Sequence, residues 1–141
     1  MSQDPVLLQV ARLLADRKLV KLVEKGSGGD CFLGWLPDEP DNVVCLRAVG
    51  GETAPSGQPY DYPTIQIVVR DRDGREALRR TTTIYNHLHG LSRLTLGPNG
   101  NYCVSIVARQ SGPVGLGLDA KGRHEYSLNY DLFIINDERG G

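Results

Sequence analysis

The stretch that decides the fold is residues 115–135, which read GLGLDAKGRHEYSLNYDLFII. From position 123 onward its side chains alternate between two faces, which predicts a long strand with one apolar face and one wet face. The apolar face consists of His124, Tyr126, Leu128, Tyr130, Leu132 and Ile134. The wet face consists of Arg123, Glu125, Ser127, Asn129 and Asp131. Phe133 and Ile135 then turn the wet face apolar, so we expect the end of the strand to be covered on both sides.

A turn precedes this strand. Residues 119–122 read DAKG, in which Asp119 suits the backbone hydrogen bonds of a turn and Gly122 is free to adopt a positive φ. Residues 114–135 are therefore predicted to form a β-hairpin whose longer arm needs a partner for its apolar face.

Two amphipathic helices are predicted upstream. The first opens at Asp4, which can cap it, with Pro5 in the first helical position, and it runs to about residue 18. Its polar side chains are expected to face water: Gln9, Arg12 and Asp16. The second helix spans residues 75–89 and ends at Gly90.

Strand patterns fill most of the remaining chain. They cover residues 31–36, 43–49, 64–70 and 102–109, while residues 91–96 fit either a short strand or an irregular link. This order of elements predicts an α+β fold, a single domain over residues 1–141, with a mainly antiparallel or mixed sheet. We expect both helices to pack on one face of the sheet, which leaves the other face partly free.

Residues 50–61 form the longest stretch without periodicity. A loop of this length inside a compact domain is usually functional or disordered until bound. Both alternatives stay open. In the first, the segment becomes ordered against a neighbouring subunit, and Tyr60 and Asp61 at its end are candidate contact residues.

Composition narrows the function classes. The chain has 141 residues and carries 16 lysines and arginines against 17 acidic residues, a net charge of -1 that disfavours a strongly basic nucleic-acid binder. It has no apolar run near the ~20 residues that a membrane span needs and no signal peptide at its start, so we expect synthesis in the cytoplasm. Three widely spaced cysteines, Cys31, Cys45 and Cys103, indicate buried free thiols.

No motif predicts catalysis or a cofactor. The glycine-rich residues 26–30 lack the Gly-Lys-Ser/Thr ending of a phosphate-binding loop. The carboxylates considered for a magnesium site are Asp61, Asp71 and Asp73. The last two flank a turn, where aspartate is favoured for its backbone hydrogen bonds. We therefore expect no metal, no cofactor and no enzyme activity, with a small metal-dependent enzyme as the least favoured alternative.

Positive side chains are dense around the start of the second helix. Arg75 and Arg79 lie four residues apart and share a helix face, and Arg72 precedes them. Glu76 is placed to pair with Arg79 or Arg80. A solvated helix face explains these arginines, and contact with nucleic-acid phosphate or an acidic neighbour is the alternative.

Several stretches resemble the tail terminator proteins of long-tailed bacteriophages, a family also labelled phage minor capsid proteins. The C-terminal stretch is PVGLGLD at residues 113–119, followed by GRHEY at 122–126 and by Asn129 and Tyr130. Upstream, LPDEPD at residues 36–41 and YPTIQIVVR at 62–70 occur in the order that the family shows. The resemblance covers nearly the whole chain.

The resemblance implies a non-enzymatic virion protein at the head-proximal end of the tail. It implies a ring, usually of six copies, that binds the end of the tail tube, stops its polymerisation and presents a surface to the head connector. The implied partners are other copies of the chain, the major tail tube protein, the head-connector or neck protein, and DNA that passes through the ring without sequence-specific binding. A head-completion or neck adaptor protein is the alternative.

The resemblance also favours contacts between subunits at Arg123 and Glu125 over cross-strand pairs within the monomer. The predicted interface comprises Arg123, Glu125, Asn129, Asp119, Tyr60 and Asp61, and the groups predicted to face DNA or a partner are Arg72, Arg75 and Arg79. We expect reversal of both charges, at Arg123 and Glu125, to leave the melting of the monomer nearly unchanged while ring formation fails.

Overall fold

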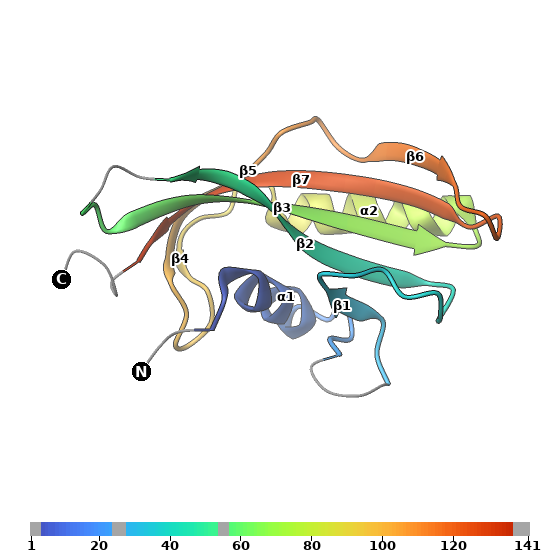
Figure 1. The fold of residues 1–141 in the computed structure, drawn as a ribbon, viewed down its shortest axis with the longest axis horizontal. Helices are drawn as coiled ribbons and strands as arrows, with labels where there is room; N and C mark the ends of the chain where they lie inside the picture. The colour runs from blue at the N-terminus through green and yellow to red at the C-terminus, as the bar shows by residue number, and fades with distance from the viewer. Residues whose placement is uncertain (1–3, 24–27, 54–56, 137–141) are drawn as a thin grey trace.

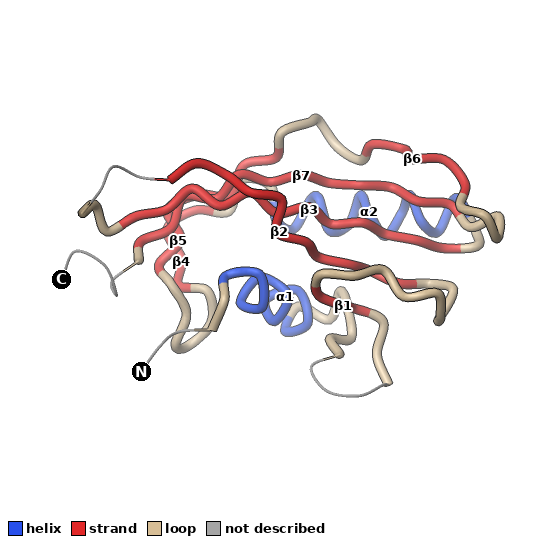
Figure 2. The backbone as a smooth tube through the Cα atoms, in the orientation of Figure 1, coloured by secondary structure: helices blue, strands red, loops and turns tan. Residues whose placement is uncertain are grey.

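A computed structural model of the chain describes residues 4–23, 28–53 and 57–136. In chain order the elements are helix α1 (Val6–Asp16), strands β1 (Cys31–Leu33), β2 (Val43–Thr53) and β3 (Tyr60–Asp71), helix α2 (Gly74–Leu88), and strands β4 (Ser92–Thr95), β5 (Tyr102–Ala108), β6 (Val114–Leu118) and β7 (His124–Ile135). The strands run along the length of the molecule and the helices lie against them (Figures 1 and 2).

The C-terminal strand β7 lies at the centre of the sheet, as its long alternating pattern requires. It pairs with β3 along nearly its whole length on one side, and with β6 and then β5 on the other. The predicted hairpin is confirmed, because β6 and β7 are antiparallel and are joined by a turn in which Gly122 has a φ of 75°. The Asp119 carboxylate accepts hydrogen bonds from the backbone N–H groups of Lys121 and Arg123, both at 2.9 Å.

The described strands form one mixed sheet. Its order is β1-β2-β3-β7-β5-β4, with β6 paired to β7 beside this path, and β1 is parallel to β2 whereas the other pairs are antiparallel. Two helices with such a sheet confirm the predicted α+β class. Residues 91–96, for which the sequence left two alternatives, contain the short strand β4.

Both helices pack on the same face of the sheet. Buried side chains of α1 and α2 share one hydrophobic core with every second residue of β2, β3 and β7. The inward residues of these strands are Val44, Leu46, Ile65, Ile67, Val69, Leu128, Tyr130, Leu132 and Ile134. We call the opposite side of the sheet the outer face; it carries the predicted wet face of β7.

The start of α1 differs from the sequence prediction. Pro5 is the N-cap residue and no side chain caps the helix, while the Asp4 carboxylate pairs with Arg12 instead. Gln9, predicted to face water, is 5% exposed. In α2, by contrast, the Asp73 carboxylate accepts from the backbone N–H groups of Arg75 and Glu76, at 2.9 and 3.3 Å, which is a standard N-cap.

The prediction of a loop at residues 50–61 is wrong for its described part. Strand β2 continues to Thr53 and β3 already begins at Tyr60, so these residues pair with each other in a projecting arm that the end of β7 also joins, while residues 54–56 lie outside the described residues (Figure 1). Gly50 and Gly51 have positive φ and lie at a bulge in the β2–β3 pairing. A glycine pair is also typical of the start of a loop, which is why a loop was predicted here, but at a bulge the strand continues.

Candidate assembly surface

A buried arginine organises one end of the outer face. Arg70, near the end of β3, is 2% exposed. Its Nη2 donates to the carbonyl oxygens of Pro37 and Pro40, both at 2.7 Å, and its Nε donates to that of Asp41 at 3.0 Å. One side chain therefore holds the loop of residues 37–41 against the sheet.

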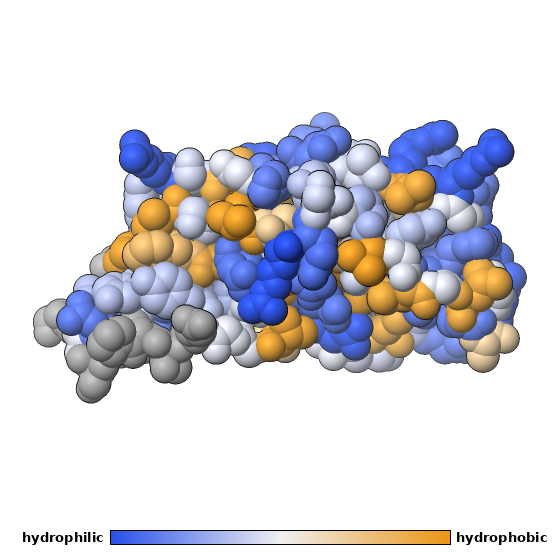
Figure 3. Space-filling view, turned by 90° about the horizontal axis from the view of Figure 1, so that it is seen from above, coloured by the Kyte–Doolittle hydropathy of each residue, from blue (hydrophilic) through white to orange (hydrophobic). Residues whose placement is uncertain are grey.

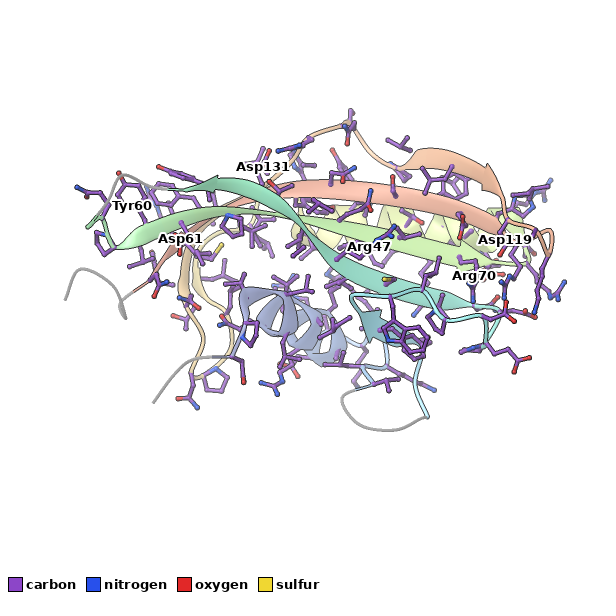
Figure 4. The ribbon with its side chains drawn as sticks, in the orientation of Figure 1. Arg47, Tyr60, Asp61, Arg70, Asp119 and Asp131 are labelled. Carbon is purple, nitrogen blue, oxygen red and sulfur yellow. The ribbon has the colours of Figure 1, made fainter. Side chains whose placement is uncertain are left out.

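A second arginine, Arg123, secures the same loop and is 3% exposed. Its Nε lies 2.7 Å from Asp119 Oδ2, and its two Nη atoms lie 3.3 Å from Asp38 Oδ1 and 3.4 Å from Asp41 Oδ1. We call Arg70, Arg123 and residues 37–41 the arginine clamp. It joins three segments that are far apart in the sequence, and Figure 4 shows Arg70 and Asp119 at the same end of the sheet.

The three aspartates that pair with Arg123 are held in their ionised form. A hydrogen bond from Lys121, with the charges of Lys121 and Arg123, lowers the pKa of Asp38, and a hydrogen bond from Arg72 does the same to the pKa of Asp41. The backbone N–H of Arg123 lowers the pKa of Asp119.

We expect the protein to lose stability in acid for this reason. A carboxylate whose pKa is lower in the folded chain than in the unfolded chain contributes stability that is present above about pH 4, the ordinary aspartate pKa, and lost as the pH falls through the folded value. The melting temperature, followed by calorimetry, should be nearly level from about pH 7 to about pH 5 and should fall below about pH 4.

Two variants serve as a comparison in the same acid series. Asp119→Asn should melt at a lower temperature at neutral pH, because one stabilising carboxylate has been removed. Its melting temperature should then fall less on acidification than that of the unmodified protein. Asp16→Asn changes an exposed carboxylate at the end of α1 and should follow the unmodified protein. A melting temperature of the unmodified protein that stays constant from about pH 5 to about pH 2 would contradict the account.

The assignment of Arg123 to an exposed wet face is wrong, and charge reversal there is therefore expected to destabilise the monomer. Arg123 was assigned to a wet face, but its guanidinium is buried and paired within one chain. An acidic residue there would face the carboxylates of Asp119, Asp38 and Asp41 and would destabilise the fold itself. Arg70 belongs to the dense group of positive residues in the sequence, but its buried role in holding a loop was not predicted.

The middle of the outer face contains a charge pair within the monomer. Arg109 Nε lies 2.9 and 3.1 Å from the two oxygens of Asp131, and Thr64 Oγ1 donates to Asp131 at 2.6 Å. At this point of β7 the polar side chains form cross-strand pairs within the monomer, one of the two alternatives that the sequence left open. Asn129 lies next to this group, and its carbonyl accepts from the backbone N–H of Arg109 at 2.8 Å.

The far end of the outer face, on the projecting arm, is aromatic. The ring centroids of Tyr60, Tyr62 and Phe133 lie 4.9 to 5.6 Å apart. This confirms that the last residues of β7 are covered on the outer side as well. Tyr60 and Asp61 thus lie at the end opposite to Asp119 (Figure 4), and the predicted interface residues do not form one cluster within a single chain.

The arginines predicted to face DNA or a partner are all exposed, at and before the start of α2. Arg79 pairs with Glu76 at 2.8 Å, as the spacing predicted, and Arg72 Nε lies 2.5 Å from Asp41 at the edge of the clamp. Arg75 follows the Asp73 cap. Their charges are therefore accessible at the clamp end of the molecule.

The described part of the chain contains no group of three or more His, Cys, Asp or Glu side chains arranged to hold a metal. Cys31, Cys45 and Cys103 are buried and free, as predicted. Burial raises the pKa of Cys31 to about 12 and that of Cys103 to about 11, so both thiols stay protonated at neutral pH. None of the described helices is long and apolar enough to span a membrane.

These features define a class of protein: an α+β protein in which buried arginines hold a loop at one end of an open sheet. The chain belongs to the bacteriophage tail terminator family, since the family model for "Bacteriophage tail terminator protein" matches residues 8–134. No match was found among curated proteins. Membership makes it a structural protein of the phage tail. Parts of the stretches that carry the sequence resemblance meet at the arginine clamp: residues 37–41, Arg70 at the end of 62–70, Asp119 at the end of 113–119, and Arg123 in 122–126.

Proposed function

We propose that this chain assembles into a ring, of six copies as the family resemblance implies, that caps the head-proximal end of the tail tube and ends its polymerisation. The observation that carries the proposal is the family match, which reaches from α1 to β7 and includes every described strand and both helices at least in part. The other side of the ring provides the surface that joins the tail to the head connector.

In this mechanism the ring caps the tail tube because the two sides of the ring differ in what they bind. Head-to-tail contacts between identical subunits close into a ring when the rotation between neighbours allows it. Such a ring stops growth if one side is complementary to the last layer of tube protein while the other side does not accept a further layer. The major tail tube protein and the head-connector or neck protein are then the partners on its two sides.

The arginine clamp supports this role because it prepares a contact surface before binding. Loop 37–41 is held through its backbone by Arg70, while the side chains of Asp38 and Glu39 remain exposed. A loop that is already ordered loses little conformational entropy on binding. The exposed Arg72, Arg75 and Arg79 at the same end are available to an acidic partner or to the backbone of DNA in the lumen, which they contact without reading sequence.

The test is electron microscopy of tails assembled by a phage that lacks this chain. We expect tails of uncontrolled and often excessive length that are not joined to heads, because nothing stops tube growth. Tails of normal length beside filled, unjoined heads would contradict capping and assign the chain to the neck. Normal virions would contradict both roles.

A further inference from the structure

Each long edge of the sheet is covered over only half of its length. Strand β1 pairs with residues 44–46 of β2, and no described backbone group bonds to the outer edge of β2 beyond Leu46. At the opposite edge, β5 covers residues 130–135 of β7, while the outer side of β6 has no backbone partner among the described residues. The two free segments, residues 47–53 of β2 and strand β6, are therefore diagonally opposed.

Strand β6 lacks the features that normally keep an edge strand from pairing. Its sequence is VGLGL, with no lysine and no proline. Val114, Leu116 and Leu118 are 37, 49 and 61% exposed. Figure 3, which looks down on the side of the molecule that carries β6, shows hydrophobic groups among hydrophilic ones. An apolar edge of this kind favours addition of another strand.

Two charged side chains on the outer face make no ion pair within the described part of the chain. Arg47 lies at the start of the free segment of β2, and its Nε is buried without a hydrogen bond there. Glu125 lies in β7 between Gly117 of β6 and Arg70 of β3; its charge favours the charged form of Arg70, but it makes no ion pair among the described residues and is half-buried. Because Gly117 has no side chain, the space beside Glu125 is open to a long side chain from beyond β6.

We propose that β6 of one copy pairs with residues 47–53 of β2 of the next copy, with an ion pair between Glu125 of the first and Arg47 of the second. The inference rests on the proposed ring, for which it names the subunit interface. The strand directions fit, because β6 is antiparallel to β7, β7 to β3, and β3 to β2. A second copy in the same orientation thus presents its β2 antiparallel to β6, the more stable pairing.

The diagonal position of the free segments also suits closure. Joining them shifts each copy along the strand direction relative to its neighbour. A sheet that closes on itself needs such a stagger, together with strands tilted from the ring axis. The same contact repeated around the ring leaves neither segment unpaired.

The test is sedimentation velocity of the full-length chain over a concentration series. The unmodified chain should associate with rising concentration, and Arg47→Glu should weaken that association at least about tenfold, as should Glu125→Arg. The variant with both changes should recover to within about threefold of the unmodified chain, because the pair is restored with its signs exchanged.

A matched pair of lysine substitutions tests the edge itself. Leu116→Lys places a charge on β6 and should weaken association at least about tenfold, whereas Leu78→Lys, on the exposed side of α2, should not. Thermal melting of every variant checks that the monomer is folded. If Glu125→Arg lowers the melting temperature of the monomer, the two single variants Arg47→Glu and Leu116→Lys still test the interface. An unmodified chain that stays monomeric to about 1 mM overturns the proposal, as does unchanged association of Arg47→Glu.

The outcome is separable from that of the proposed function. If phage lacking the chain makes overlong tails while Arg47→Glu associates normally, the capping role stands and the edge pairing is wrong. If those tails have normal length while the charge variants behave as expected, the interface stands and the capping role is wrong.

Discussion

Replacing Arg70 with methionine is expected to lower the free energy of unfolding by about 3–5 kcal/mol, the usual cost of removing one partner from a buried charged network. Methionine fills similar volume, but it leaves the carbonyl oxygens of Pro37, Pro40 and Asp41 without their donor. It also removes a positive charge from beside the neighbouring carboxylates, which then repel one another more strongly. Urea denaturation at neutral pH, with the slope checked for constancy, measures the change.

Two further variants make this result specific. Arg79→Met removes an arginine whose side chain is 71% exposed and, among the described residues, forms an ion pair with Glu76 alone; it should change the free energy of unfolding by less than about 0.5 kcal/mol. Arg70→Lys keeps the charge but not the planar fork, so it should recover only part of the loss. An Arg70→Met variant as stable as Arg79→Met would contradict the role of the clamp.

The second large effect is expected at Gln9. Its Nε2 donates to Asn101 Oδ1 at 2.8 Å, and its Oε1 accepts from the backbone N–H of Asn101 at 2.8 Å, both in buried surroundings. Gln9→Met keeps the shape and removes both of these bonds together with the bond from Nε2 to the Asp4 carbonyl oxygen at 2.6 Å, leaving polar atoms of Asn101 buried without partners. We expect a loss of about 2–4 kcal/mol in urea denaturation, at about 1–3 kcal/mol for each unsatisfied group.

The matched control for this substitution is Gln66→Met on the outer face. Gln66 is half-buried and its side chain makes no hydrogen bond within the described residues, so the same change should cost less than about 0.5 kcal/mol. Equal losses at the two positions would show that the methionine side chain, and not the lost amide pair, causes the effect.

Features set by neighbours in the sequence were predictable. The alternation in β7, the turn at residues 119–122 and the backbone hydrogen bonds expected of Asp73 all depend on residues within a few positions of one another, and the structure has all three. The same holds for the free cysteines, which lie within apolar runs. The α+β class follows because such local periods decide element type and order.

Other features depended on partners that local patterns do not contain. A glycine pair occurs both at a bulge and at the start of a loop, so the sequence did not predict the arm formed by β2 and β3. Only the pairing of β2 with β3 distinguishes the two. The alternation in β7 correctly predicted its two faces. It did not show whether a polar residue on the wet face contacts water, another strand or a loop.

The sequence by itself therefore determined the local features of this chain: where the strands and helices lie, where the chain turns and which side of each element is apolar. The partners of the polar groups were decided by the tertiary structure. Arg70 meets a loop 29 to 33 residues away, Arg123 meets Asp38 85 residues away, and Gln9 meets Asn101 92 residues away. Periodicity and turn chemistry act over a few residues, whereas burial of a charge or an amide depends on which distant segments the fold brings together.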